Sequence, residues 1–199
     1  MRGIIICGGT VGEYIKNYIK PDDFVICADS GYDHAKKFGI RADIVIGDMD
    51  STKYGDISEE KMLYPKRKDF TDSELAIMYA EKKGFESVLL FGIIGTRMDH
   101  SLANIGMISR LKNAVIIDEN NETYFAGNEF SLNGKPGDII SIIPFCEDLF
   151  GVTTVGLDYP LVAGEIKCGT SLGISNVMTG DNCRIKIEKG KALIIRSKD

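Results

Sequence analysis

Two aspartates one residue apart, Asp48 and Asp50, lie at the end of the stretch ADIVIGDMDS. Their carboxylates repel each other unless a positive charge lies nearby. A divalent cation such as Mg²⁺ takes oxygen ligands, commonly one or two carboxylates together with water and substrate phosphates. The pair therefore predicts a metal site that serves phosphate chemistry. Asp43, at the other end of the same apolar run, is expected to be structural.

A second acidic cluster, KDFTD at residues 68–72, directly precedes a predicted helix. Thr71 and Glu74 form a capping box, in which each side chain can satisfy a backbone N–H of the other residue. The free N–H groups and partial positive charge of a helix N-terminus suit anionic oxygens. We expect Asp69 or Asp72 to add a metal ligand from across the crevice.

The glycine-rich segment FGIIGTRMDH provides a third group of polar side chains. Gly92 and Gly95 allow the backbone to approach a ligand closely. Arg97 suits a phosphate clamp because its planar guanidinium matches the phosphate oxygens. Asp99 and His100 are expected either to orient Arg97 or to reach the ligand themselves.

The elements that must position these side chains alternate along the first part of the chain. Short β-branched runs, typical of parallel strands buried on both faces, are separated by amphipathic stretches. Ligands bind such sheets beyond the carboxyl ends of the strands, where Asp29 and Asp48 are found. The alternation predicts a doubly wound α/β domain. The predicted strands are 3–7, 24–28, 43–47, 87–92 and 114–118, and the predicted helices are 11–19, 30–38, 71–83 and 97–112.

The pattern changes after about residue 120. Short alternating or β-branched runs, separated by turn residues such as Asn133 and Gly134, replace the helical periodicity. These runs predict an antiparallel sandwich or barrel-like domain of six to eight strands. We therefore expect an α/β domain over residues 1–122 and an all-β domain over residues 123–199.

Composition excludes several classes of protein. The formal net charge of −5 argues against a nucleic-acid partner, because no basic surplus exists to neutralise phosphates. The chain has no run of 18 apolar residues, so we expect no membrane span. The five cysteines are scattered and lack the spacing of metal ligands. Their odd number, and an N-terminal apolar run too short for a secretory signal, favour the cytoplasm. The sequence contains no P-loop, no G-x-S-x-G elbow and no HExxH motif. Among the chemistries considered, phosphoryl-type transfer on carboxylate-bound Mg²⁺ is the one that remains.

The chain resembles the thiamine pyrophosphokinase family over the stretches ADSGYDHAKKFGIRADIVIGDMDS, KDFTDSELAI, GIIGTRMDHSLANI, SIIPF, GLDYPL and GISN. These stretches occur in the family's order and span nearly the whole chain. The resemblance implies an α/β catalytic domain, a thiamine-binding β-sandwich, and a homodimer with its sites near the subunit interface. It also implies that the pyrophosphoryl group of ATP is transferred to the thiamine hydroxyl with Mg²⁺ as cofactor, leaving AMP.

The same resemblance implies roles for individual residues. The expected magnesium ligands are Asp48, Asp50 and Asp72. The residues expected to contact ATP are Asp29, Ser30, Lys68, Thr71, Arg97 and His100. The expected catalytic residues are Asp69, Asp72, Arg97 and Asp99, and the acceptor of the hydroxyl proton is open among the three aspartates. The residues expected to line the thiamine site are Thr170, Ser171, Ser175 and Asn176. Some members of the family stack thiamine on a Trp. This chain has no Trp, so Tyr159 or an apolar residue is the candidate for this role.

Two alternatives to a thiamine pyrophosphokinase stay open from the residues alone. A nucleotide-sugar transferase can also hold a metal and a diphosphate with a DxD motif after a strand, but it leaves KDFTDSE and the C-terminal β domain unexplained. A non-catalytic sensor would bind thiamine or a nucleotide without releasing AMP. Formation of AMP from ATP and thiamine distinguishes the enzyme from both alternatives.

Overall fold

The computed structural model describes residues 1–50, 52–53 and 58–198, and the chain divides into two compact units, Met1–Glu119 and Asn120–Asp199. The division lies three residues before the boundary expected from the sequence. The first unit carries the helices and a parallel sheet, and the second unit consists of antiparallel strands. This two-part organisation confirms the predicted α/β plus all-β fold class.

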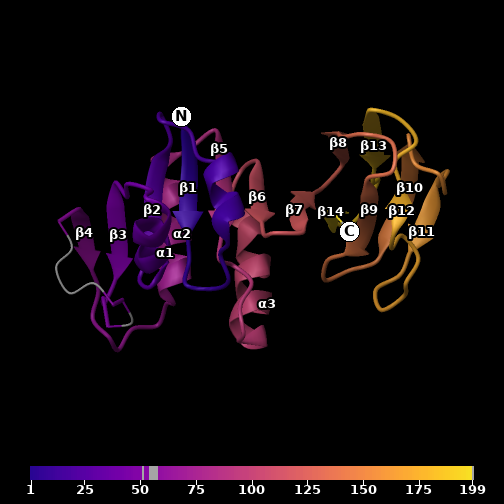
Figure 1. Ribbon diagram of the computed structural model, residues 1–199. Coiled ribbons are helices and arrows are strands. Elements are labelled where there is room, and N and C mark those ends of the chain that lie inside the picture. Colours follow the sequence, from indigo (N-terminus) through magenta and orange to yellow (C-terminus); the bar gives the residue numbers. More distant parts are fainter. Residues whose placement is uncertain (51, 54–57, 199) are drawn as a thin grey trace. The chain divides into compact units, whose positions relative to one another are not determined.

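The first unit contains a parallel sheet with the strand order β6-β5-β1-β2-β3-β4 (Figure 1). The central strands β1 and β3 are almost entirely buried, as their continuous β-branched runs predict. The edge strand β4 was not predicted, because its sequence EKML is mostly exposed and charged and has no apolar run. The strands are β1 Arg2–Ile6, β2 Phe24–Ala28, β3 Ile44–Gly47, β4 Glu60–Leu63, β5 Ser87–Phe91 and β6 Ala114–Ile117.

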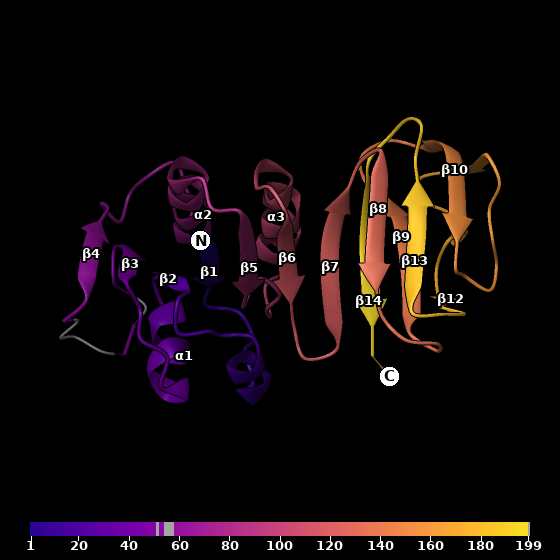
Figure 2. The same cartoon turned by 90° about the horizontal axis from the view of Figure 1, so that it is seen from above.

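Helices cover both faces of this sheet, with α2 and α3 on one face and α1 on the other (Figure 2). This arrangement confirms the doubly wound domain. The helices are α1 Gly31–Phe38, α2 Asp72–Lys83, α3 Met98–Met107 and the 3₁₀ turns η1 Glu13–Asn17 and η2 Ile108–Arg110. No helix in the described ranges is long and apolar enough to cross a membrane.

Two of the helix predictions were too long. The region predicted as a helix over 11–19 forms only the 3₁₀ turn η1 in its middle, flanked by Gly12 at its N-cap and followed by Pro21. The α-helix predicted over 97–112 ends at Met107 and tightens into η2, directly after Gly106, a poor helix former.

The N-terminus of α2 is capped by Thr71, whose Oγ1 accepts a hydrogen bond from the Glu74 N–H at 3.2 Å. Gly84 closes the helix in the left-handed conformation, as predicted. The expected capping box also has the Glu74 side chain accept a hydrogen bond from the Thr71 N–H. Instead, the Glu74 carboxylate pairs with Arg110 at 3.2 Å. One side-chain cap and the ion pairs of Arg110 with Glu74 and Glu81 therefore help to fix the helix that carries Asp72.

The second unit is a β-sandwich of two antiparallel sheets, with strand orders β12-β9-β14-β7 and β11-β10-β13-β8. Its eight strands among the described residues fall within the predicted range. Ile140, Ile142, Leu149, Val152 and Ile194 belong to the buried core between the sheets. The strands are β7 Asn121–Ala126, β8 Glu129–Asn133, β9 Ile139–Pro144, β10 Leu149–Val155, β11 Gly164–Ile166, β12 Asn176–Val177, β13 Asn182–Lys186 and β14 Ala192–Ser197.

Candidate functional site

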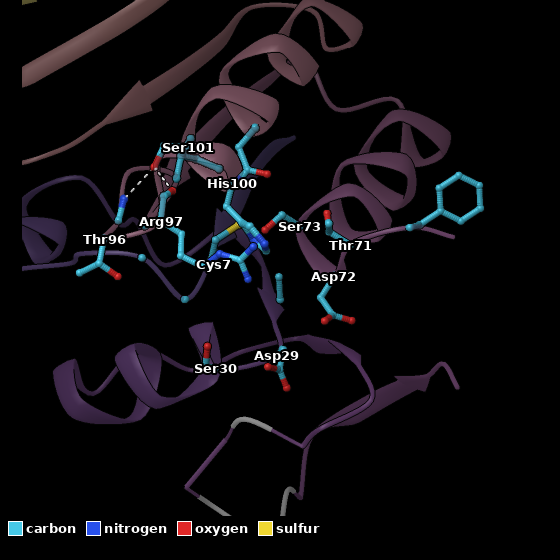
Figure 3. A pocket seen from close by; sticks show the side chains of 18 of the residues that line it. Cys7, Asp29, Ser30, Thr71, Asp72, Ser73, Thr96, Arg97, His100 and Ser101 are labelled. Atoms are coloured by element: carbon cyan, nitrogen blue, oxygen red, sulfur yellow. Dashed lines mark hydrogen bonds between the residues drawn. The ribbon is translucent and has the colours of Figure 1, made fainter. Parts of the chain in front are cut away.

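A cavity of about 430 Å³ lies at the carboxyl ends of the parallel strands in the first unit. The chain leaves β1 toward β2 on one side, and β5 returns on the other side, so the cavity lies at the topological switch point of the sheet. The lining residues come from the segments after β1, β2, β3, β4 and β5, from the start of α2 and from α3 (Figure 3).

Glycines allow the loops after β1 and β5 to pack closely under the cavity. The Gly9 N–H donates to the Gly92 carbonyl oxygen at 2.9 Å. Gly92 has a φ of +65°, and a Cβ atom there would lie 2.2 Å from the Cys7 carbonyl oxygen. The close approach at Gly92 is to the backbone of the β1 loop, whereas the sequence predicted an approach to a ligand.

Three carboxylates converge beside this cavity. Asp29 after β2 and Asp48 and Asp50 after β3 each offer an oxygen, and these oxygens all lie within 4.8 Å of one another. Asp29 and Met49 have positive φ angles of 44° and 59°, a backbone conformation that concentrates at functional sites. A set of hard oxygen donors at this spacing fits a divalent cation such as Mg²⁺.

Asp72, expected to be the third carboxylate of a metal site, is joined to Asp48 by a lysine. The Lys68 ammonium lies 3.2 Å from Asp48 and 3.0 Å from Asp72, and its side chain is only 11% exposed. Burial lowers the pKa of Lys68, but the hydrogen bonds with Asp72 and Asp48 outweigh it, so the pKa is raised and the ammonium stays charged. The nearby carboxylates are therefore partly neutralised by the chain itself.

A second lysine, Lys66, forms an ion pair with Asp50. The Lys66 Nζ atom lies 2.6 Å from Asp50 Oδ2, and Lys66 lines the cavity. Sequence reasoning expected a metal ion to provide the positive charge between Asp48 and Asp50. The structure shows that the two lysines provide positive charge at the same carboxylates.

At the start of α2, Thr71, Asp72 and Ser73 line the cavity, whereas Asp69 is exposed and is not among its lining residues. Figure 3 shows the Asp72 side chain extending from the start of α2 toward the segment that carries Asp29. Ser30 also lines the cavity at the start of α1. The N-terminus of α2 thus brings N–H donors and the Asp72 carboxylate to one wall.

Arg97 and His100, at the start of α3, form another wall of the cavity. Asp99 lies outside the lining and pairs with the Arg97 guanidinium, with an Nη2–Oδ2 distance of 2.5 Å. The hydrogen bond from Arg97 lowers the pKa of Asp99 to about 2, so Asp99 stays ionised near neutral pH. Of the two roles left open for Asp99, orienting Arg97 is the one that this geometry provides.

Sequence reasoning missed three polar residues that support the cavity. Ser101 Oγ accepts from the Gly95 N–H at 3.1 Å and donates to the Arg97 carbonyl oxygen at 3.0 Å, so it fixes the loop that carries Arg97. Asn104, one turn further, is buried and lines the cavity. Their spacing from Arg97 along the helix is the signal that could have identified them.

The third of these residues is His34 in α1. Its Nε2 atom lies 2.8 Å from the Gly9 carbonyl oxygen and donates a hydrogen bond to it, from α1 to the glycine loop after β1. Nothing in the spacing of His34 points to this contact, because it depends on how α1 packs against β1.

The second unit contains a separate cavity of about 330 Å³. Tyr159, Pro160 and Leu161 form one part of its wall, Ile142 contributes from β9, and the remaining lining residues are 171–176. Ser171, Ser175 and Asn176 are therefore brought together as expected. Thr170 is outside the lining, because its hydroxyl donates to the Lys167 carbonyl oxygen at 2.8 Å.

Asn176 holds the two parts of this wall together. Its Nδ2 donates to the Tyr159 carbonyl oxygen at 2.7 Å, and its Oδ1 accepts from the Tyr159 N–H at 3.0 Å. Ser175 has a φ of +57° and donates its N–H to Ser141 Oγ at 3.0 Å. The amide of Asn176 is thus used to position Tyr159, a residue that is 72% exposed.

Comparisons with known proteins agree for both units. A family model for the thiamin pyrophosphokinase catalytic domain matches residues 15–117, and a model for the vitamin B1 binding domain of the same family matches residues 128–193. The thiamine pyrophosphokinase of Bacillus subtilis (strain 168) is 34% identical over an alignment of 143 residues that covers 69% of this chain and 67% of that relative.

Solved structures show the same fold over the whole chain. The crystal structure of thiamine pyrophosphokinase from Bacillus subtilis has a TM-score of 0.90 at 27% identity and covers 100% of both chains. The structure of the enzyme from Geobacillus thermodenitrificans has a TM-score of 0.89 at 24% identity, covers 100% of this chain and 98% of that chain, and supports the fold alone. Taken with the matches to both domain models, these likenesses show that the chain belongs to the thiamine pyrophosphokinase family.

Proposed function

We propose that this protein transfers the pyrophosphoryl group of ATP to the hydroxyl of thiamine, forming thiamine diphosphate and AMP. One observation carries the proposal: the catalytic and vitamin B1 binding models match separate units, and each unit has its own cavity. A nucleotide-sugar transferase would not account for the match of the second unit to the vitamin B1 binding model.

The first unit's cavity binds ATP in this proposal. Asp29, Asp48 and Asp50 hold Mg²⁺, with Asp72 next to them across Lys68. The bound cation supplies positive charge to the phosphate oxygens. Lys68, Arg97 and the N-terminal N–H groups of α2 bind the same oxygens directly. The remaining ATP contacts come from Ser30, Thr71 and His100, which line this cavity.

The chain's own residues then provide the positioning that pyrophosphoryl transfer requires. Arg97, held by Asp99, binds the phosphate oxygens as negative charge spreads over them. Asp72 accepts the proton of the thiamine hydroxyl, because it lines the cavity whereas Asp69 and Asp99 lie outside the lining in the part of the chain that the structure describes. Asp69 is then left without contact to the substrates.

The second unit's cavity binds thiamine in this proposal. Tyr159, Leu172 and Ile174 offer apolar surface to the rings of thiamine, and the Ser171 and Ser175 hydroxyls offer hydrogen bonds to its polar edges. Asn176 positions Tyr159, and Thr170 lies next to the cavity in sequence without lining it.

Two further features complete the proposal. The protein works as a homodimer, supported by large apolar side chains exposed in both units, among them Met98, Leu102, Val155 and Val162. It works in the cytoplasm, supported by five cysteines that are all free.

The proposed reaction is tested with purified protein, ATP, thiamine and MgCl₂, with products separated by chromatography and identified by phosphorus NMR. Equal amounts of AMP and thiamine diphosphate are expected. Release of ADP with thiamine monophosphate would contradict pyrophosphoryl transfer. Binding of both substrates without any product would instead identify a sensor.

A further inference from the structure

Lys66 has no part in the motif that it precedes, KDFTD, yet it lines the ATP cavity. Its Nζ atom lies 2.6 Å from Asp50 Oδ2, and its side chain is 79% exposed. A long flexible side chain with a charged end is thus held at the edge of the cavity by one ion pair among the described residues. The question is what this ammonium does when the cavity fills.

The contact of Lys66 places it on an oxygen donor that a cation would need. Asp50 is one of three aspartates whose oxygens lie within 4.8 Å of one another, and Asp48, another of the three, is paired with Lys68. An ammonium and a divalent cation are both positive, so each weakens the binding of the other to the same carboxylate. Lys66 therefore competes with a divalent cation for Asp50.

The two lysines differ in how firmly they are held. Lys68 is 11% exposed and contacts two carboxylates, Asp48 and Asp72. Lys66 is mostly exposed and contacts one carboxylate among the described residues, Asp50. An exposed ion pair of this kind contributes little free energy. Its four-carbon stem allows the ammonium to reach a new partner without a change in the backbone. Lys66 is consequently the lysine that can leave its carboxylate at low cost.

We propose that Lys66 is an exchangeable counter-ion that pairs with Asp50 in the nucleotide-free protein and transfers to the phosphates of ATP when the metal-nucleotide complex binds. The inference rests on the proposed function of this cavity and adds a phosphate-binding residue to it. Its distinguishing consequence is that Lys66 opposes divalent-cation binding before ATP arrives and favours ATP binding afterwards. A residue with a purely structural role would not change the two affinities in opposite directions.

The test compares Lys66→Gln with the control Arg67→Gln, because Arg67 is adjacent, exposed and outside the cavity lining. Mn²⁺ titration of the nucleotide-free protein, followed by electron paramagnetic resonance, measures cation affinity. Calorimetry with a non-hydrolysable ATP analogue and Mg²⁺ measures nucleotide affinity. Circular dichroism verifies that both variants fold.

For Lys66→Gln, we expect the Mn²⁺ dissociation constant to fall about threefold and that of the ATP analogue to rise about tenfold. The Michaelis constant for ATP should rise accordingly while kcat changes less than about twofold. Arg67→Gln should change none of these values, and Lys66→Arg should retain nucleotide affinity.

Weakened binding of both Mn²⁺ and the analogue in Lys66→Gln, or no change in either, would overturn the role of Lys66. The binding readouts also separate this inference from the proposed reaction. If the unmodified protein released no AMP, the reaction would be wrong, while opposite shifts in the two dissociation constants would still support Lys66 as a counter-ion.

Discussion

The cavity of the first unit and the cavity of the second unit differ in the origin of their walls. The first is lined from many segments between Cys7 and Asn104, each of which follows a parallel strand or begins a helix. The second is lined by 159–161 and 171–176 with one residue of β9. The first therefore depends on the topology of a whole sheet, and the second depends on two short loops.

The two cavities also differ in charge. In the first cavity Lys68 pairs with Asp48 and Asp72, and Lys66 pairs with Asp50. Asp29 adds a further carboxylate to the lining. The second is lined by apolar, hydroxyl and amide side chains, with no charged residue among its lining residues in the part of the chain that the structure describes. This contrast suits phosphates and metal in one cavity and flat rings in the other, so substitutions should affect the two substrates separately.

The largest effect is expected for Asp48→Asn in the first cavity. Removal of one carboxylate charge from the cation and phosphate site should lower kcat about 100- to 1,000-fold with little change in folding. Steady-state kinetics at saturating Mg²⁺ measures this loss. Turnover close to that of the unmodified protein would exclude a metal role for Asp48.

Asp43→Asn is the matched control, because Asp43 flanks the opposite end of β3. Its Oδ2 accepts the Val25 N–H at 2.8 Å, which confirms the structural role expected for it. The substitution should lower the free energy of unfolding by about 1 kcal/mol and leave kcat nearly unchanged. Urea unfolding followed by circular dichroism measures the first quantity.

Asn176→Ala tests the second cavity. It removes both hydrogen bonds to the Tyr159 backbone, so the Michaelis constant for thiamine should rise about tenfold or more. The Michaelis constant for ATP should stay constant. Asn182→Ala, at an exposed asparagine outside this cavity, is the control and should affect neither substrate. An equal rise for ATP and thiamine would contradict separate cavities.

Arg97→Lys is expected to have a smaller effect, confined to ATP. A lysine keeps the charge but loses the planar fork that pairs with Asp99 and matches phosphate. We expect kcat/KM for ATP to fall about three- to tenfold, with an unchanged Michaelis constant for thiamine. Initial rates with each substrate varied in turn measure both quantities, and a loss confined to thiamine would refute the assignment.

The smallest effect is a pH dependence of stability that belongs to the first unit. Glu59 accepts hydrogen bonds from Tyr32 Oη at 2.5 Å and Lys36 Nζ at 2.7 Å. Burial raises the pKa of Glu59, but these hydrogen bonds outweigh it and lower the pKa from 4.5 to about 2. A depressed folded-state pKa stabilises the protein above pH 4.5, and this stability is lost as the pH falls toward 2.

Thermal unfolding between pH 6 and pH 2.5 checks this prediction. Glu59→Gln should be less stable than the unmodified protein at pH 6, and the difference should shrink as the pH falls. A difference that does not depend on pH would show that the carboxylate charge has no part in holding Glu59 to α1.

Much of this molecule could be predicted from local sequence patterns. The predicted strands overlap β1, β2, β3, β5 and β6 because buried parallel strands have near-continuous β-branched runs. The edge strand β4 was missed because an exposed strand has no such run. At the site, the aspartates after β2 and β3 were found because the carboxyl ends of parallel strands share one edge of the sheet.

The pairing of charges could not be read from the sequence in the same way. The bridge from Lys68 to both Asp48 and Asp72, and the contact of His34 with Gly9, depend on how loops and helices pack in three dimensions. Thr170 was expected beside thiamine because of its place in the sequence, but a local hydrogen bond turns its hydroxyl to Lys167. Spacing predicts which residues are near a site better than it predicts their partners.

The most direct test of the central claim measures both substrates on one substitution in each cavity. Asp48→Asn and Tyr159→Ala would be titrated by calorimetry with a non-hydrolysable ATP analogue in Mg²⁺ and, separately, with thiamine. We predict that Asp48→Asn weakens only the analogue and that Tyr159→Ala weakens only thiamine, each about tenfold or more. Loss of both ligands in either variant, or the reverse pairing of variant and ligand, would contradict the assignment of one substrate to each cavity.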